Sequence, residues 1–154
     1  MEMFTTMITP YKKDGSIDFE TVDKYVDWYY ESGIDGIFAV CQSSEMFYLS
    51  LKERVKLAET TVQAVKESGY AMSVVASGHI SEEIEAQAEE ITAIAQTGVD
   101  SVVLVSNRLD LHHDGDKVWI KNAEVLLSKL PEDVKLGIYE CPYPYKRLLT
   151  EEIF

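Results

Sequence analysis

A nine-residue phrase occurs twice in this chain, and it restricts the possible folds more than any other feature of the sequence. Residues 32–40 read Ser-Gly-Ile-Asp-Gly-Ile-Phe-Ala-Val, and residues 97–105 read Thr-Gly-Val-Asp-Ser-Val-Val-Leu-Val. Each copy has a glycine suited to ending a helix, followed by an apolar run typical of a buried strand. The repetition indicates a strand–helix unit used more than once, and therefore an α/β protein.

The rest of the chain fits the same unit. Apolar runs predict five strands, at residues 3–8, 36–40, 72–76, 101–105 and 134–139. The segments between them carry apolar residues at helical spacing, and we expect Ser50 with Glu53 to cap the second helix and Ser81 to cap the third. Strands that are apolar almost throughout are typical of a parallel sheet covered by helices.

Two architectures share this pattern, a doubly wound open sheet and an eight-stranded barrel. A complete barrel takes about 250 residues, whereas this chain has 154. We therefore expect a single domain over residues 1–154, which is either an open sheet or part of a barrel.

The charge of the chain excludes two classes of partner. There are 27 acidic and 14 basic residues, which give a formal net charge of −13. Because such a surface repels nucleic acid and anionic membranes, we expect neither as a partner. No apolar run has the length of a membrane span and no secretory leader is recognisable, so we expect a cytoplasmic protein. Cys41 and Cys141 lack metal-ligand spacing and are expected to be reduced thiols.

Motifs for common cofactors are missing from the sequence. It contains no GxGxxG, Walker A or GxSxG motif. The sequence therefore gives no indication of dinucleotide binding, phosphate binding or the commonest serine hydrolase chemistry. His112 and His113, between Asp110 and Asp114, suggest a metal cluster, but adjacent histidines in an extended loop point apart. We expect a solvated loop there, and no metal or cofactor.

The polar residues that follow the strands are the candidate site, because ligands bind at the carboxyl ends of parallel strands. Gln42, Ser43 and Ser44 follow the second strand and offer one amide and two hydroxyls. Alternatively, these side chains only cap the backbone of their own loop. Tyr139 ends the fifth strand, where its phenol is suited to relay a proton if a neighbour assists its ionisation. The alternative is a core tyrosine with a hydrogen-bonded hydroxyl.

A series of short motifs runs through the chain in a distinctive order. The motifs are Thr9-Pro-Tyr11, Asp14-Gly-Ser-Ile-Asp18, residues 33–37, Ser43-Ser-Glu45, and residues 49–54, 98–102 and 138–142. In order and spacing they resemble the dihydrodipicolinate synthase / N-acetylneuraminate lyase family, over nearly the whole chain. The resemblance implies a class I aldolase-type (β/α)8 TIM barrel, of which this chain covers about the first five βα units, and a homo-oligomer.

The resemblance also implies a chemistry, which is Schiff-base aldol addition or cleavage with pyruvate or a related 2-oxo acid as the small-molecule substrate. Tyr139 corresponds to the family tyrosine that relays protons. Residues 41–45 correspond to the loop that binds the substrate carboxylate, which makes Gln42, Ser43 and Ser44 the expected substrate-binding residues. The family's nucleophilic lysine belongs to the sixth strand, past residue 154, so we expect this chain alone to be inactive.

Several positions depart from the family pattern. Gln42 stands where the family has a hydroxyl residue, and Cys41 and Ser44 stand where it has glycines. Leu109 occupies the position of a tyrosine that neighbouring subunits share in the synthase, which argues against an authentic dihydrodipicolinate synthase.

The strand-five region departs as well, and it leaves the second substrate open. Pro144 falls where a basic residue is expected, with Lys146 and Arg147 as candidate substitutes. An alternative function is a non-catalytic half-barrel that assembles with itself or another chain through an exposed sheet edge. A third is an open-sheet binding module of flavodoxin-like shape.

Overall fold

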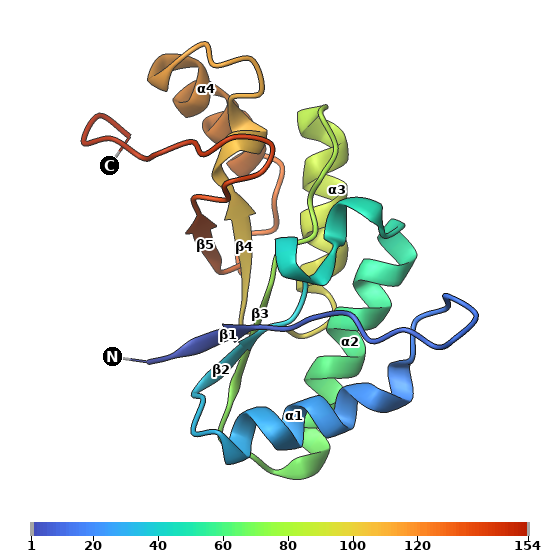
Figure 1. Cartoon of the computed structure of the whole chain (residues 1–154). Helices are drawn as coiled ribbons and strands as arrows, with labels where there is room; N and C mark the ends of the chain where they lie inside the picture. The colour runs from blue at the N-terminus through green and yellow to red at the C-terminus, as the bar shows by residue number, and fades with distance from the viewer. Residues whose placement is uncertain (1, 154) are drawn as a thin grey trace.

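The computed structural model describes residues 2–153 and contains one parallel sheet of five strands with helices along one face (Figure 1). The strands are β1 (Phe4–Thr6), β2 (Gly36–Phe38), β3 (Ser73–Ala76), β4 (Ser101–Val105) and β5 (Leu136–Tyr139). The α-helices are α1 (Val22–Glu31), α2 (Leu51–Ser68), α3 (Ile84–Ala95) and α4 (Asp116–Leu127). Short 3-10 turns are η1 (Phe19–Thr21), η2 (Gln42–Ser44), η3 (Met46–Tyr48) and η4 (Ser106–Leu109). All five expected strands are confirmed, four of them shorter than predicted.

The cap of α2 forms as expected, and that of α3 does not. Ser50 Oγ accepts the N–H of Glu53 at 3.3 Å, and the Glu53 carboxylate accepts the N–H of Ser50 at 2.8 Å. The expected cap at Ser81 is wrong, because α3 begins only at Ile84. The N–H of Ser81 donates to the Glu90 carboxylate at 3.1 Å, and this bond holds the residue in the preceding loop.

The order of the strands decides between the two architectures. Neighbouring strands follow the sequence, β1-β2-β3-β4-β5. A flavodoxin-like sheet would place the first strand between the second and third, so that alternative is excluded. Each helix packs against the next, α1 on α2, α2 on α3 and α3 on α4, as a row on one face does (Figure 1). The chain is therefore a segment of a (β/α)8 barrel.

The sheet is curled, as a barrel wall requires. Phe38 on β2 and Tyr139 on β5 are three strand spacings apart, which is about 14 Å in a flat sheet. Their rings nevertheless meet edge to face, with centroids 5.8 Å apart and planes at 82°. Both rings therefore lie on the concave face, which is the interior side of the barrel.

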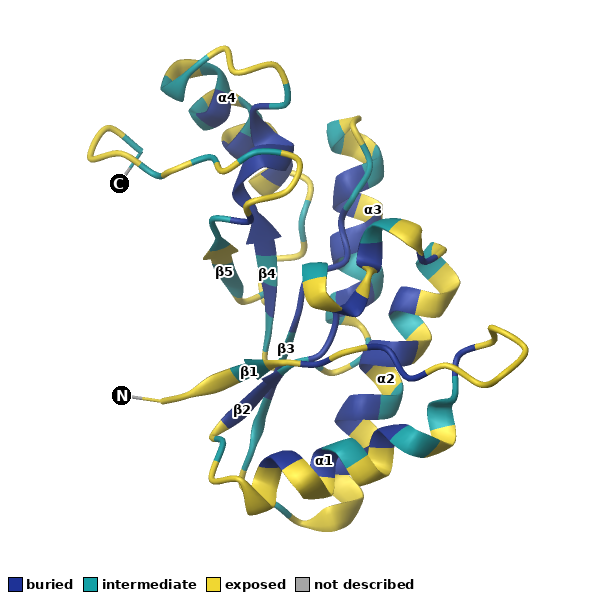
Figure 2. Cartoon of the chain, in the orientation of Figure 1, coloured by how far each residue is buried: buried dark blue, intermediate teal, exposed yellow. Residues whose placement is uncertain are grey.

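The hydrophobic core fills the space between the convex face and the helices. Ile37, Val74 and Leu104 are buried there with Leu57 of α2. Ile138 of β5 pairs in register with Leu104, but it is 42% exposed where Leu104 is 4% exposed. The reason is that no helix follows β5 within residues 2–153, which leaves this strand less covered than β4 (Figure 2).

Candidate functional site

The loop after β2 is anchored through Ser44, which is fully buried. Its hydroxyl oxygen lies 2.6 Å from the carbonyl oxygen of Met7 and 3.0 Å from that of Ala39, and it accepts the N–H of Cys41 at 3.1 Å. The Thr9 hydroxyl donates to the Ser44 carbonyl oxygen at 2.6 Å. Ser44 therefore ties the ends of β1 and β2 together and has no surface left for a ligand.

Gln42 and Ser43 differ from Ser44, because their side chains reach solvent. Within residues 2–153, neither Gln42 Nε2 nor the Ser43 hydroxyl has a hydrogen-bond partner. The turn ends at Glu45, whose backbone is left-handed (φ 59°) and whose carboxylate accepts the Tyr11 hydroxyl at 2.8 Å. Burial and then the Glu45 carboxylate raise the pKa of Tyr11 to about 12, so this hydroxyl keeps its proton and the bond persists at neutral pH.

The exit of β5 meets the exit of β2 directly. The N–H of Cys141 donates to the carbonyl oxygen of Tyr139 at 2.8 Å, which turns the chain sharply at the end of the strand. The Cys141 thiol then donates to Gln42 Oε1 at 3.2 Å, although 99 positions separate the two residues. The structure thus brings Tyr139 and Gln42 to the same end of the curled sheet.

The environment of Tyr139 keeps its phenol protonated. Partial burial raises the pKa of Tyr139, and the neighbouring Cys141 and Cys41 raise it further. At neutral pH this group is therefore equipped to donate a proton rather than to accept one.

Asn107, in the η4 turn that follows β4, holds the β5 exit in place. It is fully buried, and its Nδ2 lies 3.1, 2.9 and 2.6 Å from the carbonyl oxygens of Cys141, Tyr143 and Tyr145. No residue pattern in the sequence signals this role, since the bonds run to backbone atoms more than 30 positions away.

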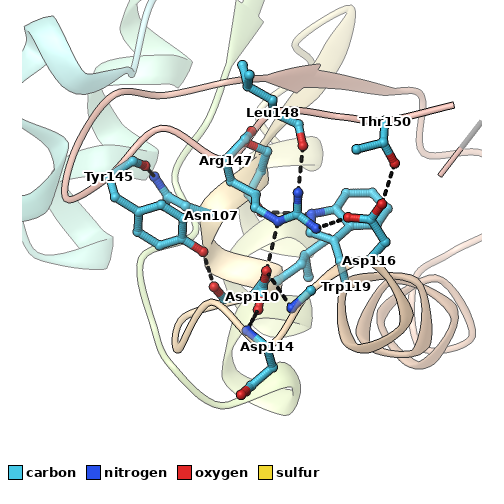
Figure 3. Close-up of polar contacts among 12 residues, drawn as sticks. Asn107, Asp110, Asp114, Asp116, Trp119, Tyr145, Arg147, Leu148 and Thr150 are labelled. Atoms are coloured by element: carbon cyan, nitrogen blue, oxygen red, sulfur yellow. Dashed lines mark hydrogen bonds and ion pairs between the residues drawn. The ribbon is translucent and has the colours of Figure 1, made fainter. Parts of the chain in front are cut away.

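Of the two candidate substitutes for a basic residue, Arg147 is already occupied (Figure 3). Its Nε lies 2.8 Å from the Asp110 carboxylate, and its Nη2 bonds the Asp116 carboxylate. The guanidinium therefore binds the segment after β5 to the loop after β4 and to the start of α4. Lys146 is exposed, and its Nζ lies 3.9 Å from the Glu140 carboxylate. Its charge is therefore less engaged by carboxylates of this chain than that of Arg147.

The histidines of the loop after β4 do not form a cluster with the nearby aspartates. His112 and His113 are exposed, and the His113 ring stacks on Tyr145 with centroids 3.5 Å apart. Asp110 is 2% exposed and accepts the N–H of Asp114 at 2.7 Å. No three histidine, cysteine, aspartate or glutamate side chains in the described chain are arranged to hold a metal ion.

His79 follows β3 and is a structural residue. It is fully buried, its Nδ1 lies 3.0 Å from Gln87 Oε1, and its Nε2 accepts the N–H of Val105 at 2.7 Å. Burial lowers the pKa of His79 to about 4, so the ring is neutral and joins β3 to β4 and α3.

The five strands contain no lysine, so none of them places an amine at this site. Lys135 directly precedes β5 and therefore lies at its amino end, opposite the site.

Residues 2–153 include no helix with the length and apolar character to cross a bilayer.

The sequence is similar to known proteins over about two thirds of the chain. The sequence model of the Dihydrodipicolinate synthetase family matches residues 1–107. The 4-hydroxy-tetrahydrodipicolinate synthase of Oceanobacillus iheyensis is 32% identical over 105 residues, which are 68% of this chain and 34% of that protein. The synthase of Saccharophagus degradans is 34% identical over 101 residues, 65% of this chain and 33% of that protein. The matched segment thus spans about a third of these curated relatives.

Solved structures agree on the fold. Dihydrodipicolinate synthase from Acinetobacter baumannii, complexed with pyruvate, superposes with a TM-score of 0.77 at 20% identity, covering 92% of this chain and 46% of that one. CdNal from Clostridium difficile, in complex with mannosamine, gives 0.78 at 17% identity, covering 98% and 50%. In both superpositions this chain matches about half of a TIM barrel, in agreement with its strand order. The chain belongs to the dihydrodipicolinate synthetase family.

Proposed function

We propose that this chain is part of a lyase or synthase that acts on pyruvate or a related 2-oxo acid by Schiff-base aldol chemistry. The observation that carries the proposal is the 3.2 Å contact between the Cys141 thiol and Gln42 Oε1. It brings the polar loop after β2 against the end of β5 that carries the Tyr139 phenol. Hydrogen-bond donors for a substrate carboxylate and a group that can give a proton therefore lie at one end of the sheet. We further propose a cytoplasmic homo-oligomer.

In this proposal Gln42 and Ser43 bind the carboxylate of the 2-oxo acid. A carboxylate accepts hydrogen bonds only, and it is best matched by donors that have no protein acceptor already. Gln42 Nε2 and the Ser43 hydroxyl meet that condition, whereas the Ser44 hydroxyl is used by backbone groups. We therefore assign Ser44 to anchoring the loop and leave binding to its two neighbours.

Tyr139 supplies the proton that aldol chemistry needs. Because burial and Cys141 raise the pKa of Tyr139, the phenol enters the reaction protonated and gives its proton to the oxygen on which negative charge develops. It recovers a proton when the reaction runs in the other direction.

The covalent step needs an amine, and the described residues 2–153 place none on a strand at this site. A lysine that forms a Schiff base must be neutral when it attacks, which requires a buried position, and exposed lysines are mostly protonated at neutral pH. No strand residue here is a lysine. We propose that residues 1–154 alone are inactive and that the lysine comes from outside them.

Two measurements on this chain test the proposal. Titration with pyruvate, followed by amide shifts in NMR spectra, should move the signals of Gln42 and Ser43, and Gln42→Ala should weaken binding about tenfold, the effect of one hydrogen bond. Gln96→Ala, an exposed glutamine after α3, is the matched control and should bind as the unaltered chain does. Absence of pyruvate binding would overturn the proposal.

The second measurement addresses the missing amine. Borohydride reduction in the presence of pyruvate, read by mass spectrometry, should leave this chain unlabelled. Labelling of any lysine within residues 1–154 would contradict the proposal that the Schiff-base lysine comes from outside them.

A non-catalytic half-barrel is the second candidate function, and exposed apolar residues on the outer strands favour it. Ile138 of β5 is 42% exposed and Phe4 of β1 is 40% exposed. Both belong to strands with only one neighbour in the described sheet. Light scattering that finds a stable oligomer without pyruvate binding would support this candidate, and a monodisperse monomer would count against it.

A further inference from the structure

We propose that Cys141 is a positioning residue of the candidate site, which holds the Gln42 carboxamide by its oxygen and so presents the two N–H donors of Nε2 to the carboxylate of the substrate. The inference rests on the proposed function for the identity of that carboxylate. The orientation of the amide itself follows from the contact between Cys141 and Gln42.

The choice of donor and acceptor follows from the groups present. A thiol has one proton to give, and the amide oxygen at 3.2 Å is a good acceptor for it. With the amide turned the other way, Nε2 would face the sulfur and the carbonyl oxygen would face the ligand. Two oxygens that both accept cannot bond each other, so that orientation rejects a carboxylate. Cys141 thus selects the orientation that binds an anion.

The sulfur is held in place from two sides. Cys141 is fully buried, its N–H bonds the carbonyl oxygen of Tyr139 at 2.8 Å, and its own carbonyl oxygen accepts from Asn107 Nδ2 at 3.1 Å. The carbonyl oxygen of Tyr143, at 3.4 Å, is a second acceptor for the thiol, but it is the longer contact. The thiol proton is therefore directed mainly at Gln42.

The same residue links both halves of the site. Cys141 raises the pKa of the Tyr139 phenol, its own N–H bonds the Tyr139 carbonyl oxygen at 2.8 Å, and its thiol donates to Gln42, so this one residue contacts both loops of the site. Replacing the thiol should therefore change two measurable properties at once: the order of the Gln42 amide and the ionisation of the Tyr139 phenol.

A purely packing role makes a different prediction from a positioning role. Valine is larger than cysteine, fills the space of the thiol with apolar atoms and donates nothing, whereas serine is smaller and keeps a donor. If Cys141 only fills space, Cys141→Val should behave like the unaltered chain. If it positions Gln42, Cys141→Ser should be the better replacement. Cys41→Ala is the control for loss of a buried thiol, since the hydrogen-bond contact of Cys41 Sγ is with Ser44, at 3.5 Å, and not with Gln42.

The experiment uses the ¹⁵N-labelled chain and these three variants, each first shown by urea unfolding to be folded. Side-chain relaxation should report an ordered Gln42 Nε2 group in the unaltered chain, Cys141→Ser and Cys41→Ala, and a mobile one in Cys141→Val. Pyruvate affinity should fall about tenfold in Cys141→Val and stay within about threefold in the other two. The pKa of Tyr139, followed with ¹³C-labelled tyrosine, should fall in Cys141→Val.

The outcomes separate this inference from the proposed function. An ordered Gln42 amide and unchanged pyruvate affinity in Cys141→Val overturn the positioning role, whatever the chain binds. An unaltered chain that binds no pyruvate overturns the proposed function and with it the presentation to a 2-oxo acid, while the relaxation data still decide whether Cys141 orients the amide.

Discussion

Arg54 of α2 and Glu90 of α3 form a buried ion pair, with Arg54 Nη2 3.0 Å from Glu90 Oε1 and side chains 4% and 8% exposed. Glu90 Oε2 also accepts the N–H groups of Ile80 and Ser81, at 2.8 and 3.1 Å. Arg54 Nη1 bonds the Gly78 carbonyl oxygen. The pair therefore fixes the loop after β3 against both helices.

Breaking this pair should destabilise the chain strongly. Glu90→Gln leaves the Arg54 charge buried without a counter-charge, and we expect a loss of about 3 to 5 kcal/mol in the free energy of unfolding. Urea titration measures it. Lys56→Ala, which breaks the exposed Lys56–Glu59 pair of α2, is the control and should cost about 0.5 kcal/mol or less. A Glu90→Gln variant as stable as this control would show that the pair is not needed.

Acidification should destabilise the chain through His79 before most carboxylates titrate. Its pKa is about 4 in the folded chain because of burial and about 6.5 when unfolded. Between these values the unfolded state binds the extra proton, so stability is complete above about pH 6.5 and falls by about 3 kcal/mol as pH drops to 4.

The pH effect can be assigned to His79 by substitution. In His79→Gln the slope of unfolding free energy between pH 6.5 and 4.5 should largely disappear. His112→Ala, which removes an exposed histidine, should keep the slope. An unchanged slope in His79→Gln would transfer the effect to another group.

Adjacent serines of the β2 exit should respond differently to the same substitution. Ser44→Ala removes a hydroxyl bonded to three backbone groups, and leaves those groups buried, so we expect a loss of about 1 to 3 kcal/mol in unfolding free energy. Ser43→Ala, at an exposed position, should change it by about 0.5 kcal/mol or less. Equal effects would mean that the loop is not anchored through Ser44.

A methyl group at Gly36 should displace the Phe4 ring, because a Cβ there would overlap the ring. We expect Gly36→Ala to cost about 1 to 3 kcal/mol of unfolding free energy. The cost should vanish in a Phe4→Ala background, and this double-mutant cycle tests the contact directly. Gly137→Ala is the control, since its Cβ would meet Val103 at an ordinary 3.6 Å.

Local patterns in the sequence were sufficient to predict the strands and one helix cap, but not the order of the strands in the sheet. The capping box at Ser50 and the strand at residues 101–105 formed as predicted, because neighbouring residues decide both. The arrangement of the strands depends on contacts across the sheet, such as that between Phe38 and Tyr139, and hydrophobic periodicity carries no information about them. Only the motif resemblance pointed to a barrel.

The sequence predicted that the loops after β2 and β5 lie at the same end of the sheet, but not which of their side chains are buried. Gln42, Ser43 and Ser44 are all uncharged polar residues after a strand in the sequence, yet only Ser44 is buried and bonded to backbone. The Cys141–Gln42 contact has no sequence signal, since it joins loops 99 positions apart. Burial and long-range proximity are properties of the whole fold, which local sequence patterns do not encode.

The strand order also has a dynamic consequence. β2 is paired on both sides, whereas β5 is paired only with β4 within residues 2–153. Edge strands open by local fluctuation more easily than central ones, so amide hydrogens of β5 should exchange faster than those of β2. Gln42 and Ser43 follow the slow strand and Tyr139 ends the fast one. The two halves of the site therefore differ in rigidity, and a ligand that bridges them would slow exchange chiefly in β5.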